Sequence, residues 1–267
     1  SNQLCVAVWA VPPGRAASIE SQVDTVEFRE LLNTPGPVLL DGGMGTMLQA
    51  RGLSMGEWPE LVALEHPDWL EDIHRAYVEA GAQILCANTF GANREKLGRT
   101  GRTVEEVVPP SVEIARRAAR GRALVALDVG PTGQLLEPTG TLRFEEAVDI
   151  FAQTVRAGVQ AGADLILIET MTALQEARAA LLAAKENSSL PVIVTMTYEE
   201  RGRTFLGCDP ASAALTLEGM GADAIGVNCS LGPREMPPLV RELTRWSTLP
   251  IAIKPNAGLP DPGGAGY

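Results

Sequence analysis

Seven short apolar runs constrain the fold of this chain more than any other feature. Each holds four to six residues, mainly valine, isoleucine, leucine and alanine, which is too few for a helix. The runs are continuous rather than alternating in hydrophobicity, a pattern typical of parallel strands buried on both faces. The sequence therefore predicts parallel strands within residues 37–41, 83–89, 123–130, 164–170, 191–198, 223–230 and 250–256.

Helical patterns separate the predicted strands. In residues 143–162 apolar side chains recur on one helix face, and Gly162 is expected to end that helix. Residues 67–81 repeat the design, and the alanine-rich residues 172–186 strongly favour a helix. One glycine-containing joint leads from helix to strand three times, which indicates a repeated unit, at residues 80–82, 161–164 and 221–223.

Seven such units in series favour a (β/α)8 barrel over a doubly wound open sheet. No strand is followed by a GxGxxG or P-loop motif, which argues against a nucleotide site. An eighth parallel strand is not apparent. Either it is missing from this chain or its place is filled another way, for which the apolar N-terminal segment CVAVWAVPP is one candidate.

Composition excludes some classes of partner. The formal net charge of −11 argues against nucleic acid or an anionic membrane surface, so a small molecule or another protein is expected. No apolar run approaches the roughly 20 residues that span a bilayer. Because the four cysteines (Cys5, Cys86, Cys208 and Cys229) are far apart and form no CxxC pair, we expect reduced thiols in a cytoplasmic protein.

A polar group ends almost every predicted strand, where a parallel barrel carries its chemistry. Such residues often cap the next helix, and any one of them is explained equally well by that role. Asp41, Glu169 and Cys229 together favour a functional site at one mouth of the barrel. The strand-end residues are Asp41, Asn88, Thr89, Asp128, Glu169, Thr170, Thr197, Tyr198, Asn228, Cys229, Lys254 and Asn256.

Two carboxylates are expected at that mouth. Asp41 is the first charge after a buried run, and Gly42 and Gly43 let the backbone turn sharply beside a ligand. Glu169 belongs to a residue type that is seldom buried without a partner. Converging carboxylates suit a substrate with an amino group. They also suit a glycosidase acid/base pair, but with 4% aromatic residues the stacking surfaces that sugars need are scarce.

The roles of Cys229 and Lys254 stay open at this point. Cys229 fits an inert buried thiol, a nucleophile, or a zinc ligand that needs further donors. A nucleophile needs a base, and the two histidines, His66 and His74, lie far from it in sequence; Cys208 is a weak second thiol donor. Lys254 fits a Schiff-base residue of a metal-free lyase or aldolase, or an ion pair with a neighbouring carboxylate.

Several motifs together resemble the homocysteine S-methyltransferase family, most closely the N-terminal homocysteine-binding module of the cobalamin-dependent methionine synthases. The resemblance runs in order from about residue 30 to residue 260. It rests on LLDGGMGTMLQARGL, HPDWLEDIHRAYVEAGAQILCANTFGANREKLG, DVGPTG, LILIETMTALQEARAAL, GADAIGVNCSLGP and IAIKPNAGLP.

The resemblance implies a (β/α)8 barrel in which three cysteine thiolates hold zinc, and zinc presents the homocysteine thiolate to a methyl donor. It places the first zinc ligand and the catalytic role at Cys229, and the amino acid end of homocysteine at Asp41 and Glu169. Methylcobalamin on another module is the expected donor, and folate- and cobalamin-binding modules on the same or another chain are expected partners. The substrate site is further expected to include Gly42, Gly43, Asn88, Thr89 and Asn228.

One departure from the family pattern concerns the metal. The other two zinc cysteines of the family form an adjacent pair in a GGCC motif after the last strand, and this sequence has no adjacent cysteines. We therefore expect a barrel over residues 26–267 that is incomplete at its C-terminus, preceded by an arm over residues 1–25, and inactive alone. The alternative is a zinc-less, non-catalytic amino-acid-binding barrel or scaffold.

Overall fold

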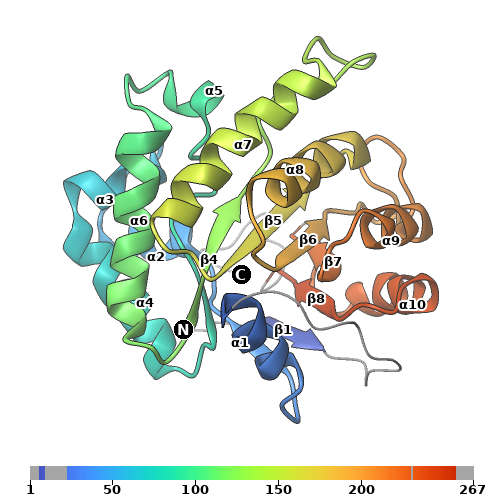
Figure 1. The fold of residues 1–267 in the computed structure, drawn as a ribbon, viewed down its shortest axis with the longest axis horizontal. Coiled ribbons are helices and arrows are strands. Elements are labelled where there is room, and N and C mark those ends of the chain that lie inside the picture. The colour runs from blue at the N-terminus through green and yellow to red at the C-terminus, as the bar shows by residue number, and fades with distance from the viewer. Residues whose placement is uncertain (1–5, 10–22, 230, 257–267) are drawn as a thin grey trace, which may run out of the picture.

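The computed structural model describes residues 6–9, 23–229 and 231–256. Within them the strands form one closed barrel in which each strand pairs with its neighbour in the chain (Figure 1). The strands are β1 (Val6–Trp9), β2 (Val38–Leu40), β3 (Ile84–Cys86), β4 (Leu124–Val129), β5 (Leu165–Met171), β6 (Val192–Met196), β7 (Ala224–Asn228) and β8 (Ile251–Lys254).

The seven predicted parallel strands are confirmed. Strands β2 to β8 each fall in one of the seven apolar runs, and all their neighbouring pairs are parallel. The sequence therefore correctly predicted an α/β fold of TIM-barrel type. That an eighth parallel strand and a paired-cysteine segment are missing from this chain remains a prediction.

Strand β1 closes the barrel. It runs antiparallel to β2, with Val6 opposite Leu40, and antiparallel to β8, with Val8 opposite Ala252. The backbone edges of β2 and β8 are thereby paired, as native sheets require. Of the two explanations for the eighth position, the N-terminal segment supplies the strand seen here. Residues 1–5 and 10–22 of the predicted arm, which include Cys5, lie outside the described residues.

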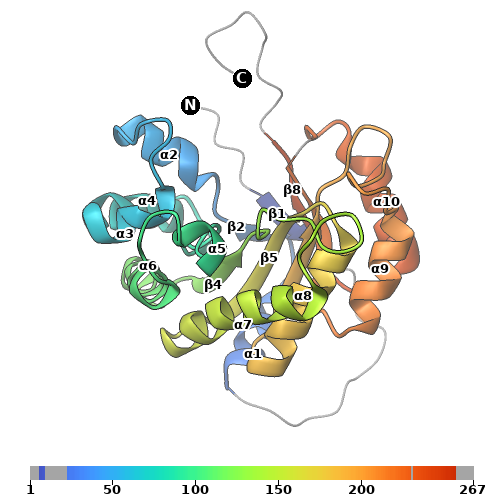
Figure 2. The same cartoon turned by 90° about the horizontal axis from the view of Figure 1, so that it is seen from above.

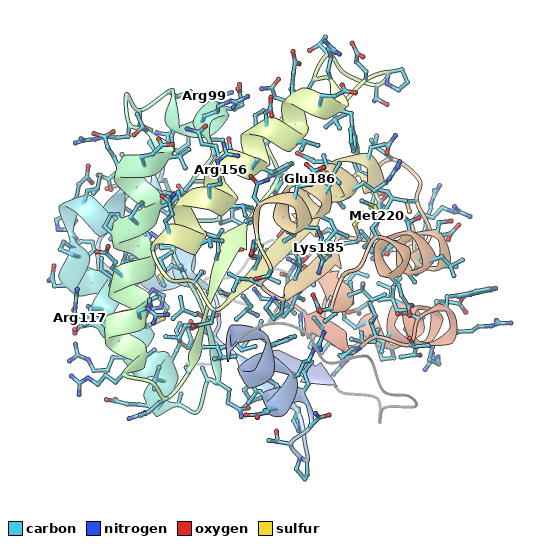
Figure 3. The ribbon with its side chains drawn as sticks, in the orientation of Figure 1. Arg99, Arg117, Arg156, Lys185, Glu186 and Met220 are labelled. Carbon is cyan, nitrogen blue, oxygen red and sulfur yellow. The ribbon has the colours of Figure 1, made fainter. Side chains whose placement is uncertain are left out.

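The helices surround the strands, and their outer faces carry charged side chains, for example Arg117 (Figure 3). Figure 2 shows α1 and α2 at opposite ends of the barrel. The α-helices are α1 (Val23–Leu32), α2 (Met44–Arg51), α3 (Val62–Glu65), α4 (Pro67–Glu79), α5 (Arg94–Leu97), α6 (Val104–Ala119), α7 (Phe144–Gln160), α8 (Leu174–Asn187), α9 (Pro210–Gly219) and α10 (Met236–Trp246), and a 3-10 turn, η1, spans Pro59–Leu61. No helix in the described ranges combines the length and the apolar character needed to cross a bilayer.

The predicted helix-to-strand joint occurs three times. Its glycine adopts a positive φ in each copy, a left-handed conformation that favours a residue without a Cβ. The three glycines are Gly81, Gly162 and Gly221, with φ of 103°, 89° and 87°.

The residue two positions after each glycine accepts a hydrogen bond from a backbone N–H near the amino end of the strand that precedes the joint. This side chain satisfies a group that strand pairing alone leaves free. The three acceptors are Gln83 Oε1 for Leu39 N–H (3.1 Å), Asp164 Oδ2 for Val125 N–H (2.7 Å) and Asp223 Oδ2 for Val192 N–H (2.9 Å).

Strands β3 to β7 are buried on both faces, which explains the continuous apolar runs. On β5, Leu165 and Leu167 belong to the inner cluster, whereas Ile166 and Ile168 belong to the outer cluster under the helices. Phe28 of α1 packs into the inner cluster and covers the amino end of the barrel. The inside of the barrel is therefore a packed core below its mouth.

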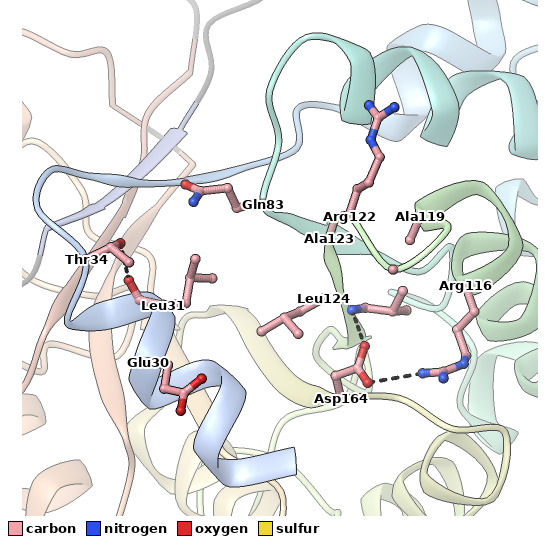
Figure 4. Close-up of a pocket in the computed structure, with 12 residues that line it drawn as sticks. Glu30, Leu31, Thr34, Gln83, Arg116, Ala119, Arg122, Ala123, Leu124 and Asp164 are labelled. Atoms are coloured by element: carbon pink, nitrogen blue, oxygen red, sulfur yellow. Dashed lines mark hydrogen bonds and ion pairs between the residues drawn. The ribbon is translucent and has the colours of Figure 1, made fainter. Parts of the chain in front are cut away.

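A side cavity of about 560 Å³ opens beside α1 at the amino end of β4 (Figure 4). Its walls include Glu30, Arg116 and Arg122. Arg116 pairs with Asp164 at 3.1 Å, and Asp164 also caps the amino end of β4. These charges serve the joint described above, so this cavity gives no sign of a reaction site.

His74 is a fully buried histidine on the core side of α4. Neither ring nitrogen has a hydrogen-bond partner in the described part of the chain. Burial lowers the pKa of His74 from 6.5 to about 4, because the charged ring loses its hydration. The folded protein therefore holds this ring neutral.

This histidine predicts an acid-sensitive fold. Its folded pKa lies below its unfolded value, so stability is lost as pH falls from 6.5 towards 4, where the unfolded chain binds the proton first. Between pH 7.5 and 4.5 the wild-type chain should lose about 2 to 3 kcal/mol of unfolding free energy that His74→Leu keeps. Urea unfolding at both pH values measures this difference. His66→Leu, at an exposed ring, is the control, and an equal loss in both variants would contradict the assignment.

Candidate active site

A cavity of about 640 Å³ opens at the carboxyl ends of the parallel strands. Its floor follows from the two-residue period of β5, where Glu169 continues the inward series of Leu165 and Leu167. By the same period Asp128 follows Ala126 on β4, and Lys254 follows Ala252 on β8. The top layer of the barrel interior is therefore polar and charged, above an apolar core.

Nearly all the predicted substrate residues line this cavity. The exception is Thr89, which is buried beside it and exchanges hydrogen bonds with the backbone of Asp128. Its hydroxyl links the end of β3 to β4, and the side chain does not line the cavity. The predicted residues on the cavity wall are Asp41, Gly42, Gly43, Asn88, Glu169, Asn228 and Cys229.

Lys254 reaches across the barrel to Glu169. Its Nζ forms an ion pair with Glu169 Oε2, and both side chains are nearly buried. Nζ also lies 3.9 Å from Cys86 Sγ. Burial by itself lowers the pKa of Lys254, but the acidic groups around it, Cys86, Glu169, Asp128 and Asp41, outweigh burial and raise the pKa well above its usual range.

A lysine held in an ion pair with a raised pKa is a poor Schiff-base nucleophile, because that chemistry needs a neutral amine. Of the two roles considered for Lys254, the structure shows the ion pair with a neighbouring carboxylate.

Asp41 and Asp128 each keep one carboxylate oxygen without a partner. Asp41 Oδ2 accepts the Cys86 N–H at 2.8 Å, but Oδ1 has no hydrogen bond among the described residues, and neither has Asp128 Oδ1. The two residues are 2% and 7% exposed, and both line the cavity. Burial raises the pKa of Asp41 to about 6 and that of Asp128 well above its usual range, and the charge of Glu169 adds to both shifts. The cavity therefore presents two buried acceptors to whatever enters it.

Asn228 fixes the geometry of the strand tips. Its Oδ1 accepts from the Thr170 N–H at 2.9 Å and from the Thr195 hydroxyl at 2.8 Å. Its Nδ2 donates to Thr170 Oγ1 at 2.7 Å and to Cys229 Sγ at 3.3 Å. One buried amide thus ties β5, β6 and β7 together and holds the thiol in place.

The chain is strained at both tips that Asn228 joins. Thr170 and Cys229 have φ of 61° and 56°, which non-glycine residues rarely adopt, and each costs about 1–3 kcal/mol. Their side chains lie 4.0 Å apart. Burial, followed by the negative charge of Glu169, raises the pKa of the Cys229 thiol. This thiol is therefore protonated at neutral pH unless a bound cation stabilises the thiolate.

The turn η1 forms one wall of the cavity. Asn88 Nδ2 donates to the Pro59 carbonyl at 2.6 Å, and Glu60 Oε1 accepts the Gly91 N–H at 2.8 Å. At Gly42 a Cβ would lie 2.8 Å from Tyr77 Oη, so the turn after β2 has no room for a larger residue. Neither Gly42 nor Gly43 has a positive φ, so the requirement for glycine at position 42 is the close contact with Tyr77 and not the predicted backbone freedom.

Comparisons with known proteins agree on one family. A model of the homocysteine S-methyltransferase family matches residues 38–267. The chain belongs to this family.

Two relatives are methionine synthases from mycobacteria. The Mycobacterium tuberculosis protein is 34% identical over 85% of this chain, and the Mycobacterium leprae protein 32% identical over 94%. The chain spans about a fifth of the length of these relatives, 20% and 22%. Among solved structures, the homocysteine methyltransferase MmuM from Escherichia coli shares the fold. Its metallated and oxidized forms give TM-scores of 0.73 and 0.75 at 24% identity, covering 81% and 82% of this chain and 82% of MmuM.

The described residues alone do not form the zinc site expected of this family. Cys229 supplies one thiol at the mouth, but no group of three His, Cys, Asp or Glu side chains in the described ranges can hold a metal ion. Cys86 faces the same cavity with the Lys254 ammonium beside its sulfur, an unfavourable place for a cation. Cys208, the weak second donor, is absent from the cavity wall, and its Sγ donates to the Asp209 carbonyl at 3.4 Å.

A cysteine–histidine catalytic pair is also not formed. His74 is buried under the helices and His66 is exposed, stacked on Trp69, and neither lines the cavity with Cys229.

Asp128 and Lys254 line the cavity as well, although they were expected only as strand-end residues and not as part of the site. The inward series on each strand, Ala126 before Asp128 and Ala252 before Lys254, was available as a signal. Cys86, for which the sequence predicted only a reduced thiol, also continues the inward series from Ile84. Every second residue of a strand points to the same face, so counting in steps of two from a buried inward residue identifies Asp128, Lys254 and Cys86 as inward-facing.

Removing the Asn228 amide should loosen the site and the fold together. Asn228→Ala leaves buried donors and acceptors on three strands without partners, so the unfolding free energy should fall by about 2–4 kcal/mol. Asn256→Ala, at a half-buried residue on the same cavity, should change it by less than about 0.5 kcal/mol. Denaturant titration of both variants measures these values. Equal stabilities for the two would show that Asn228 does not hold the strand tips.

Proposed function

We propose that the chain binds homocysteine in the cavity at the barrel mouth and presents its thiol for methylation, yielding methionine. The observation that carries the proposal is the buried, unpartnered Asp41 Oδ1 on the wall of a cavity that also holds Cys229, in a chain of the homocysteine S-methyltransferase family. An orphaned buried acceptor favours a ligand that brings a donor, and the substrate ammonium supplies one.

The two ends of an amino acid find complementary partners on this wall. The acidic residues of the cavity floor attract the ammonium group. The first turn of α2, after Gly43, has no side-chain cap and no acidic residue, so its N–H groups suit the carboxylate. With both ends held, the side chain of homocysteine, two methylene groups and a thiol, extends towards Cys229.

The reaction proposed is a transfer between sulfur and a methyl donor. The sulfur–carbon bond forms as the bond from the methyl group to the donor breaks, and the thiol proton must leave first. In this chain Asn228 and the strained tips of β5 and β7 position the Cys229 side of the cavity. Zinc, when bound by Cys229 and further thiolates, would supply the charge that keeps the substrate sulfur deprotonated.

The methyl donor and the partner modules are proposed from the resemblance of the sequence motifs to the cobalamin-dependent methionine synthases. Methionine synthase is the name of both mycobacterial proteins, and this chain corresponds to about a fifth of each. We propose methylcobalamin on a separate module as the donor, with a folate module as a further partner, all in the cytoplasm. We propose a barrel over residues 26–267 preceded by an arm over residues 1–25, and strand β1 (Val6–Trp9) of that arm completes the sheet.

Homocysteine binding tests the proposal directly. NMR titration of the chain with homocysteine should show saturable shifts, and Asp41→Asn should weaken binding about ten- to hundredfold, because one charged acceptor for the ammonium is lost. Glu30→Gln is the matched carboxylate-to-amide control, at the opposite end of the barrel. Full affinity in Asp41→Asn would remove this residue from the substrate site.

Zinc affinity tests the metal part of the proposal and its alternative, a zinc-less amino-acid-binding barrel. Competition with a chromogenic chelator should show that this chain holds zinc far more weakly than a closed three-thiolate site, because Cys229 is one donor. Adding a segment with two adjacent cysteines after β8 should create tight binding that Cys229→Ser abolishes. Tight stoichiometric zinc in the chain as it stands, unchanged by Cys229→Ser, would refute Cys229 as a ligand.

A further inference from the structure

The carboxyl end of β5 departs from a regular strand. Ile168 of β5 lies opposite Val194 of β6. The next pair is Met171 with Met196, so three steps along β5 match two steps along β6. This is a β-bulge, in which one extra residue on one strand changes the direction of the side chains beside it. Thr170 lies in the bulge, and its φ of 61° is left-handed.

The bulge places two consecutive side chains on the cavity wall. In a regular strand, neighbouring side chains point to opposite faces of the sheet. Glu169 and Thr170 nevertheless both line the cavity, and Met171 belongs to the outer cluster under the helices. A left-handed conformation is an outlier for a β-branched residue. The strained backbone therefore brings the Thr170 hydroxyl to the site.

Cys229 reaches the same cavity in the same way. Asn228 continues the inward series of Ala224 on β7, so a regular strand would point the next side chain outward. Cys229 instead has a φ of 56°, and its side chain lines the cavity beside that of Asn228. A left-handed residue at each strand tip thus brings a hydroxyl and a thiol together, with Thr170 Oγ1 4.0 Å from Cys229 Sγ.

The hydrogen bonds of Thr170 leave its hydroxyl hydrogen for the sulfur. Asn228 Oδ1 accepts the Thr170 N–H at 2.9 Å, and Asn228 Nδ2 donates to Thr170 Oγ1 at 2.7 Å. Oγ1 accepts from the amide and keeps its own hydrogen to donate. A thiolate can only accept, so a deprotonated Cys229 receives the Thr170 O–H and, at 3.3 Å, a second Asn228 Nδ2 hydrogen.

We propose that Thr170 is a positioning residue for Cys229: its hydroxyl fixes the direction in which the Cys229 sulfur points into the cavity. Two donors that approach from different strands restrict the sulfur more than either donor does alone. Thr170 acts through Cys229, and this role needs no contact with the substrate. The inference rests on the proposed function, in which the substrate thiol lies beside Cys229.

Thiol–disulfide exchange with homocystine, the disulfide of two homocysteines, measures this alignment. The Cys229 thiolate attacks one sulfur of homocystine and forms a bond to that homocysteine. The disulfide bond of homocystine breaks, the other homocysteine leaves as a thiolate, and the Cys229 proton passes to the buffer. Bis(2-hydroxyethyl) disulfide reacts in the same way but has no amino acid end.

The ratio of the two exchange rates at Cys229, homocystine over the hydroxyethyl disulfide, reports alignment with a bound homocysteine. A change in thiolate content or in solvent access alters both rates alike and leaves the ratio unchanged. Mass spectrometry of peptides separates Cys229 from Cys208. Because Cys208 is absent from the cavity wall, its ratio provides the reference without alignment.

The ratio at Cys229 should fall about tenfold in Thr170→Val, because a small misplacement of reacting atoms slows their reaction. Thr170→Gly also lacks the hydroxyl but accepts the left-handed φ without strain, so it should fold and show the same fall. Thr170→Ser keeps the hydroxyl and is the matched control, with a ratio within about twofold of wild type. Melting curves verify that each variant folds, and NMR titration should show homocysteine affinity within about threefold of wild type in all three.

The outcomes separate this inference from the function on which it rests. A folded Thr170→Val or Thr170→Gly variant with the wild-type ratio overturns the inference, and so does a loss in Thr170→Ser as large as in Thr170→Val. If the wild-type chain binds homocysteine but its ratio at Cys229 is no higher than at Cys208, the inference is wrong while substrate binding stands. If NMR titration detects no homocysteine binding, the proposed function and the inference fall together.

Discussion

The pairing of β1 with both β2 and β8 is the constraint on which the rest of the structure depends. Seven parallel strands alone have two open edges, and an open sheet has no inside. Once the edges are paired, every second side chain of every strand is forced into one enclosed column. That column is filled by apolar residues up to the level of Leu167 and becomes polar one step higher, at Glu169. The site is a consequence of closure as much as of the residues in it.

Placing charges on top of a packed core is costly, and the structure limits the cost in two ways. Lys254 and Glu169 neutralise each other, which offsets part of the loss of hydration. Asn228 satisfies its own amide and three partners at once, so a single uncharged group rigidifies the mouth without adding charge. Within this layer, the carboxylate oxygens without a hydrogen-bond partner among the described residues are Asp41 Oδ1 and Asp128 Oδ1. The unsatisfied part of the layer marks where a ligand is needed.

Much of this was predictable from residue order. The seven apolar runs predicted the parallel strands, and the repeated glycine joint predicted the turns at Gly81, Gly162 and Gly221. The gathering of strand-end residues at one mouth also followed from parallel strands. Pairs of side chains that meet across the barrel could not be predicted from residue order, because Lys254 and Glu169 are brought together only when the barrel closes. Thr89 was expected on the cavity wall, but local order could not show that its hydroxyl bonds to Asp128 instead. The assignment to homocysteine came from the family motifs rather than from strand-end chemistry.

The antiparallel direction of β1 affects what can be attached to this barrel. A strand that runs against its neighbours enters the sheet at the end where they leave it, so Val6 lies opposite Leu40, one residue before Asp41. Strand β8 leaves the sheet at Lys254, on the same rim. In an ordinary all-parallel barrel the two chain directions point to opposite ends. Here a domain tethered ahead of β1 and one tethered after β8 both start beside the cavity, so even a short flexible linker gives either of them a high effective concentration there.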